Sequence, residues 1–84
     1  MDWTFWMRRD SDLRSTTLFY KFEIEARTSF AVAVIIARLE KALKLEVHRN
    51  RINHWTYDIT RHNAMIRILR NEKLLLGRLA GEGL

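Results

Sequence analysis

The sequence contains no cysteine and no proline, and its three glycines, Gly77, Gly81 and Gly83, all lie near the C-terminal end. Without cysteine, the chain can form neither a disulfide framework nor a thiolate metal site, which fits a reducing compartment. Without a glycine-rich stretch between other elements, it has no phosphate-binding loop. Disulfide-stabilised scaffolds, cysteine-ligated zinc domains and P-loop nucleotide-binding proteins are therefore excluded.

Long apolar runs are also missing. The longest run covers residues 30–37 and has eight residues, whereas a helix needs about 20 apolar residues to span a bilayer. The first ten residues place an acid first, aromatics next and basic residues last, which is the wrong order for a secretory signal. We therefore expect a cytoplasmic protein that does not engage a membrane.

Basic residues are plentiful, and their distribution is uneven. The formal net charge is +5; residues 1–47 carry eight Lys and Arg against seven Asp and Glu, while residues 48–84 carry seven against three. Arginine outnumbers lysine by eleven to four, and its planar guanidinium suits phosphate and carboxylate recognition. The basic second half indicates an anionic partner, although a merely solvated charged surface has the same composition.

With 84 residues, the chain is long enough for one modest core, and we expect a single domain over 1–84. Residues 28–47 predict a long central helix, because Thr28 or Ser29 can cap it and no glycine or proline interrupts it. One face of this helix is apolar throughout. The other face is apolar only in its first half, around Phe30 and Val34, and this half needs cover from a second element or a partner.

Three stretches alternate between apolar and polar residues, as strands do. Residues 17–26 alternate most clearly, residues 3–8 are expected to pair with them as a hairpin, and residues 54–59 form a third candidate strand. The core is then expected to contain Leu18, Tyr20, Phe22, Ile24, Val32, Ile35, Ile36, Leu39 and Leu43.

The last segment allows two interpretations. As a helix starting at Asn63, it has a good N-cap and a continuous apolar face that only Glu72 interrupts. As a hairpin, residues 65–69 would pair with 74–79 across a turn that lacks glycine. We favour the helix, and so predict an α+β domain of order β-β-α-β-α, with an antiparallel sheet packed against the central helix and a C-terminal helix.

No residue pattern predicts catalysis, a metal site or a cofactor. The three histidines, His48, His54 and His62, are six and eight residues apart, so no two share a helix face as zinc ligands would. The carboxylates lie in turns or on single strand faces, where nothing would separate their pKa values as acid–base catalysis requires. We therefore expect a protein that is not an enzyme.

The strongest functional signal is a mixture of cations and aromatics around residues 48–62. Arginines suit phosphate contacts, and Trp55 and Tyr57 could stack on unpaired bases, although they alternate as core residues also would. The predicted sites for nucleic acid or an acidic partner are Arg49, Arg51, His54, Arg61, His62, Arg67 and Arg70.

Aromatic residues near the N-terminus suggest a second surface. Because they lie on both faces of a short predicted strand, at least one should be exposed or covered by a partner. With the second apolar face of the central helix, they make a homodimer a further expectation. The candidate interface residues are Trp3, Trp6, Phe30 and Val34.

Two classes of function therefore stay open. The first is a non-catalytic module that binds an anionic surface, nucleic acid above all, through the Arg-rich half. The second is a small protein-binding inhibitor or adaptor that docks on an acidic surface of a larger machine. Its size and lack of motifs are like those of inhibitors that phages encode against nucleic-acid-processing or defence complexes.

Overall fold

The computed structural model describes residues 2–51 and 59–82, and every regular element in this part of the chain is a helix. Helix α1 covers Trp3–Ser15, α2 Lys21–Glu25, α3 Ser29–Arg51 and α4 Ile59–Glu82. The predicted α+β class is therefore wrong: the described residues contain no strand and no sheet.

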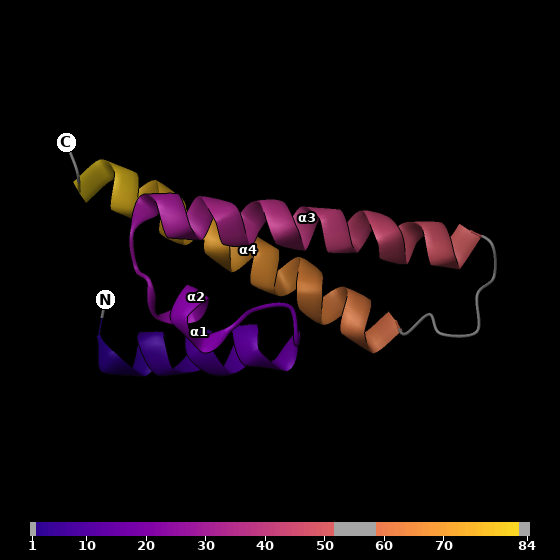
Figure 1. Ribbon diagram of the computed structural model, residues 1–84, viewed down its shortest axis with the longest axis horizontal. Helices are drawn as coiled ribbons and strands as arrows, with labels where there is room; N and C mark the ends of the chain where they lie inside the picture. Colours follow the sequence, from indigo (N-terminus) through magenta and orange to yellow (C-terminus); the bar gives the residue numbers. More distant parts are fainter. Residues whose placement is uncertain (1, 52–58, 83–84) are drawn as a thin grey trace.

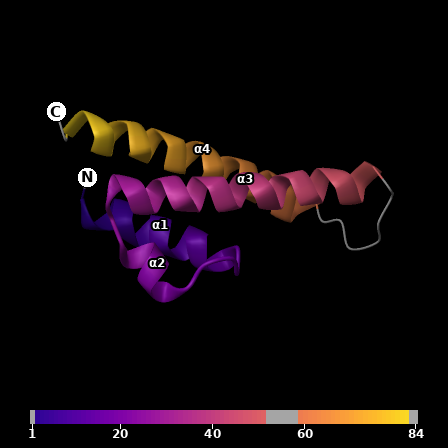
Figure 2. The ribbon, with the colours of Figure 1, turned by 45° about the horizontal axis from the view of Figure 1, so that its top comes forward.

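Helices α3 and α4 run antiparallel and lie side by side along most of their length (Figure 1). Helix α1 lies along one half of this pair, and the short α2 packs against α1 (Figures 1 and 2). The other half of the α3–α4 pair extends beyond α1, and the molecule is correspondingly elongated, with extents of 45 × 23 × 19 Å.

The central helix agrees with its prediction. Thr28 caps it, since its Oγ1 accepts a hydrogen bond from the Ala31 amide at 3.1 Å. Val32, Ile35 and Leu39 are buried, as expected for the apolar face of a helix with 3.6 residues per turn. The opposite face stays exposed, with Phe30 at 78%.

The predicted first strand is instead the start of α1. Asp2 caps this helix by accepting a hydrogen bond from the Phe5 amide at 3.0 Å. Phe5, Arg9 and Leu13 follow at four-residue intervals and turn toward the core, Arg9 and Leu13 being buried. The alternation over residues 3–8 hid this spacing, because Arg9 brings a charge to a core position.

The predicted second strand, residues 17–26, is a connection followed by the five-residue α2. A single strand without a partner would leave its backbone groups unpaired; in the helix, Glu23 accepts a hydrogen bond from the Tyr20 amide at 3.0 Å. Tyr20 and Phe22 are 72% and 71% exposed, so their predicted core positions are wrong, while Ile24 is buried as expected.

Helix α4 resolves the ambiguity at the C-terminal end in favour of a helix. It begins at Ile59, before the predicted cap Asn63, and continues to Glu82. The hairpin alternative is wrong. The predicted third strand, residues 54–59, lies outside the described residues except for Ile59, which opens α4.

The core lies where the helices meet. One cluster joins all four helices, and a second cluster continues along α3 and α4 toward the end of α4. The first contains Leu13, Ile24, Ile35, Leu39, Met65 and Ile68, and the second is built on Val32, Ile36 and Leu75. Leu18 and Leu43, predicted as core, are partly buried against the first cluster.

No helix in the described ranges combines the length and apolar character that crossing a bilayer requires.

Candidate binding surface on α4 and the groove beside α1

The exposed side of α4 carries cations and almost no negative charge. Arg67, Arg70, Lys73 and Arg78 are all exposed and lie on one side of a helix with 3.6 residues per turn. Among the α4 side chains that the structure describes, the only acidic one is Glu72, which is 2% exposed and faces inward. We call these four residues the cationic face. Its length is about 17 Å, because each helical residue rises about 1.5 Å.

The burial of Glu72 has a specific cause. The Arg9 Nη2 and Glu72 Oε1 atoms are 2.9 Å apart, and Arg9 Nε donates to both carboxylate oxygens at 3.0 and 3.2 Å. Arg9 Nη1 also donates to the Ile24 carbonyl at 3.0 Å. This bidentate pair satisfies both charges inside the core and joins α1 to α4. The pair with Arg9 thus allows Glu72 to lie on the buried apolar face of α4, and Glu72 adds no negative charge to the outer surface of the helix.

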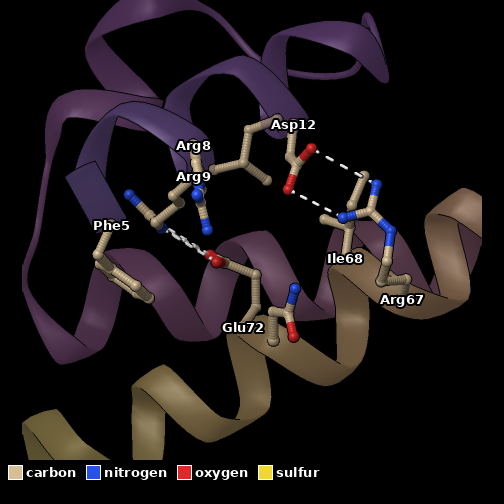
Figure 3. A pocket seen from close by; sticks show the side chains of 9 residues that line it. Phe5, Arg8, Arg9, Asp12, Arg67, Ile68 and Glu72 are labelled. Atoms are coloured by element: carbon tan, nitrogen blue, oxygen red, sulfur yellow. Dashed lines mark hydrogen bonds and ion pairs between the residues drawn. The ribbon is translucent and has the colours of Figure 1, made fainter.

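A groove of about 340 Å³ lies between α1 and α4, and this pair forms part of its lining (Figure 3). Arg8 lines it from α1 and Arg67 from α4, and Arg67 Nη1 lies 3.2 Å from Asp12 Oδ2 across it. This contact is exposed and therefore weak. The full lining consists of Phe5, Arg8, Arg9, Asp12, Leu13, Arg67, Ile68, Asn71 and Glu72.

The groove continues toward the end of α4. A second hollow of about 450 Å³ shares Phe5 and Asn71 with it and adds Leu74 and Arg78. Leu74 is 64% exposed. The first hollow is lined mainly by charged and polar side chains of both signs, whereas the second is mainly apolar with Arg78 at its edge. Both hollows border the cationic face.

The predicted binding residues separate into groups. Arg67 and Arg70 are exposed on α4 as expected, and both belong to the cationic face. Arg61 faces inward instead: its Nη1 lies 3.6 Å from Glu46 Oε1, and its Nη2 donates to the Thr16 carbonyl at 3.3 Å. His62 is half-buried beside it.

The side chains of the remaining predicted cations lie outside the described part of the chain. Arg49 and Arg51 belong to the last turn of α3, with side chains outside the described part of the chain, and His54 lies outside the described residues. Trp55 and Tyr57, the proposed stacking aromatics, lie outside them as well.

The predicted interface residues fall into two separate places. Phe30 and Val34 of α3 share a hollow with Phe22 of α2. Trp3 and Trp6 line a different hollow on α1. Trp3 is 74% exposed.

Trp6 has its main contacts within the molecule. The Arg27 guanidinium lies 4.3 Å from the centroid of its ring, and Phe5 meets it edge to face at 5.1 Å. Trp6 is therefore engaged in packing α1 against the start of α3.

The predicted binding residues did not include Arg8, Lys73 or Arg78, which belong to the candidate surface. Arg8 was assigned to a strand, and the signal that could have placed it is the four-residue spacing of Arg8 and Asp12 on one side of a helix. Lys73 and Arg78 could have been found by noting that residues 59–81 contain a single acid, Glu72, and that it lies on the apolar face of the helix.

Comparison of the chain with protein-family models, with curated proteins and with solved structures gives no match. Within the described ranges, no group of three or more His, Asp and Glu side chains is arranged to hold a metal ion.

Proposed function

We propose that this protein is a non-catalytic module that binds nucleic acid through the cationic face of α4. The observation that supports this proposal is the sorting of charge on α4: Arg67, Arg70, Lys73 and Arg78 point outward, and Glu72 points inward against Arg9. A row of cations with no exposed acid of its own helix between them attracts a polyanion. Asp12 of α1 pairs with Arg67 at one end of this row. The formal net charge of +5 acts in the same direction.

The length and chemistry of the face favour a nucleic-acid backbone over a small anion. A row of about 17 Å is long enough to meet several successive phosphates, since duplex DNA carries one charge per roughly 1.7 Å of its axis. The residues Ile59–Glu82 include no Phe, Tyr or Trp. Phosphate contacts are therefore expected to dominate over base stacking, and a duplex should bind at least as well as a single strand.

The test is the salt dependence of binding to a short duplex, followed by fluorescence anisotropy. Each cation that neutralises a phosphate adds about 0.9 to the slope of log affinity against log salt on duplex DNA. The double variant Arg70→Ala/Lys73→Ala should therefore lower the slope by about two and weaken all sequences alike. Both side chains are exposed, so the fold should be retained.

The matched control removes two charges from another helix. Lys41 and Lys44 are exposed on α3, outside the cationic face. The variant Lys41→Ala/Lys44→Ala carries the same net charge as the test variant and should leave the slope almost unchanged. Equal losses in both variants, or no binding to DNA or RNA at low salt, would contradict the proposal.

A second candidate function is a protein-binding inhibitor or adaptor, supported by the groove and its extension. The apolar lining of the second hollow and the cations of the adjoining cationic face fit an acidic, partly apolar protein surface. Leu74, exposed in the second hollow, would be an anchor for such a partner. Leu74→Ser should then weaken a nuclease-resistant one-to-one complex while leaving the salt slope for DNA unchanged, whereas Arg70→Ala/Lys73→Ala would mainly slow association.

A further inference from the structure

Three exposed aromatic side chains gather where α2 meets the start of α3. Tyr20 and Phe22 are stacked, with ring centroids 5.7 Å apart and planes within 6° of parallel. Phe22 and Phe30 line the same hollow of about 300 Å³, together with Val34 and smaller side chains. The exposed fractions are 72% for Tyr20, 71% for Phe22 and 78% for Phe30. We call Tyr20, Phe22, Phe30 and Val34 the aromatic patch.

We propose that the aromatic patch is a self-association surface, and that its occupant is the same patch of a second copy of this chain. The area is sufficient. Each aromatic offers roughly 200 Å² of surface when fully exposed, so three at about three-quarters exposure present about 450 Å². One side of a standard interface buries about 800 Å², of which somewhat more than half is apolar. The aromatic patch therefore supplies the apolar part of one such side.

The patch has the two features that a two-fold interface requires. It has both a projecting side chain, Phe30, and a hollow bounded by Phe22 and Val34. In a two-fold interface each copy meets the same surface of the other, so a projection and a recess must both be present in one patch. Phe30 of each copy can then enter the hollow of its partner.

The charges around the patch are compatible with a second copy. Lys21 and Glu25 lie on α2 beside the patch, form an exposed pair with 3.8 Å between Nζ and Oε1, and offer one charge of each sign. Arg38 and Glu23 form a second pair next to it. Because both signs are present, a two-fold arrangement can place Lys21 opposite the partner's Glu25 without opposing like charges. A strongly acidic or basic partner would gain nothing from such a rim.

The test is the molecular mass in solution, measured by sedimentation equilibrium from low to high micromolar concentration. The wild-type chain should shift from a monomer of 10.1 kDa to twice that mass. Phe30→Glu and Phe22→Glu each place a carboxylate in the patch and should raise the dimer dissociation constant tenfold or more. Both positions are exposed, and circular dichroism verifies that each variant keeps its helices.

The matched control is Leu74→Glu, which makes the same kind of change at another exposed apolar residue. It should dimerise as the wild type does. A wild-type chain that stays monomeric at high micromolar concentration would overturn the proposal and leave the patch to a different protein. A dimer that withstands both Phe30→Glu and Phe22→Glu, or that Leu74→Glu disrupts equally, would overturn it as well.

Discussion

At the scale of single residues, the most consequential contact is the buried pair of Arg9 and Glu72. Both side chains are almost fully enclosed, at 5% and 3% exposure. Removing one partner leaves the other as an unpaired buried charge, so Arg9→Met should lower the free energy of unfolding by about 3–5 kcal/mol. The double variant Arg9→Met/Glu72→Leu should recover most of this loss, because no uncompensated charge remains.

Urea denaturation of the four members of this double-mutant cycle measures the effect. Arg14→Met serves as the control, since it breaks the exposed pair of Arg14 with Asp10 and should cost less than about 1 kcal/mol. A similar small cost for Arg9→Met would mean that the pair contributes little to the attachment of α1.

The backbone conformation of Thr17 lowers the stability of the fold. Its φ angle of 59° lies in the left-handed region, directly after the C-cap of α1 at Thr16. A β-branched residue is strained there, while glycine adopts this conformation freely. Thr17→Gly should therefore raise the free energy of unfolding by about 0.5–1 kcal/mol in thermal or urea denaturation. Ser15→Gly, within the helix, should destabilise by a similar amount.

Glu23 makes the stability depend on pH. The hydrogen bond from the Tyr20 amide holds the pKa of this carboxyl below its ordinary value of 4.5, burial opposes the shift, and Arg38 adds to it. The pKa of Glu23 is lower in the folded state than in the unfolded state. Between these two pKa values the unfolded state therefore binds more protons. The stabilisation of the folded state by ionised Glu23 is complete above about pH 4.5 and is lost as the pH falls through the folded pKa.

Acid titration of the free energy of unfolding checks this pH dependence. Glu23→Gln should flatten the curve below pH 4.5, and Arg38→Gln should flatten it only partly, because the amide hydrogen bond remains. Identical curves for Glu23→Gln and the wild type would contradict the assignment.

At the scale of the helices, the sequence predicted two of the four helices that the described residues form. The central helix was visible because an uninterrupted apolar face runs along it, and residues 28–47 were close to the observed Ser29–Arg51. Helix α4 was visible through its periodicity and the absence of a turn-forming glycine. Its one discordant residue, Glu72, is explained only by Arg9, which is 63 positions away and which no local pattern could pair with it.

Helices α1 and α2 were missed because short windows of alternation do not require a strand. A strand needs a partner to pair its backbone groups, and the described part of the chain contains none. Likewise, the alternation of Tyr20 and Phe22 with charges predicts core positions, although both residues are exposed. Of the candidate site, the sequence predicted Arg67 and Arg70 on an outer face, while the groove formed with α1 depends on tertiary packing.

The two faces of α3 should respond very differently to truncation. Leu39 is fully buried between α1 and α4, whereas Val34 is 37% exposed on the opposite side. Leu39→Ala should cost about 2–5 kcal/mol in chemical denaturation. Val34→Ala should change the stability of the monomer by less than about 0.5 kcal/mol. A cost well under 1 kcal/mol for Leu39→Ala would contradict the observed packing of α3.

At the scale of the whole molecule, the surface separates a cationic side from an apolar one. The cationic face lies on α4, and the aromatic patch lies where α2 meets α3. A phosphate backbone and a second protein chain would therefore bind at different surfaces and would not compete with each other. Arg70→Ala/Lys73→Ala should leave self-association unchanged. The monomeric Phe30→Glu variant should bind DNA with the same slope of log affinity against log salt as one wild-type chain.

Self-association through the aromatic patch also predicts how heat stability depends on protein concentration. A dimer that forms only in the folded state stabilises that state by mass action, so Tm rises with concentration. The wild type should show this rise, while Phe30→Glu should give one Tm throughout the same range. Leu74→Glu, which leaves the patch intact, should follow the wild type. Because an exposed Phe30 contributes little to the monomer core, the Tm of Phe30→Glu should equal that of the wild type at its lowest concentration. A Tm that falls well below this limit would assign Phe30 to the stability of the monomer instead of the dimer.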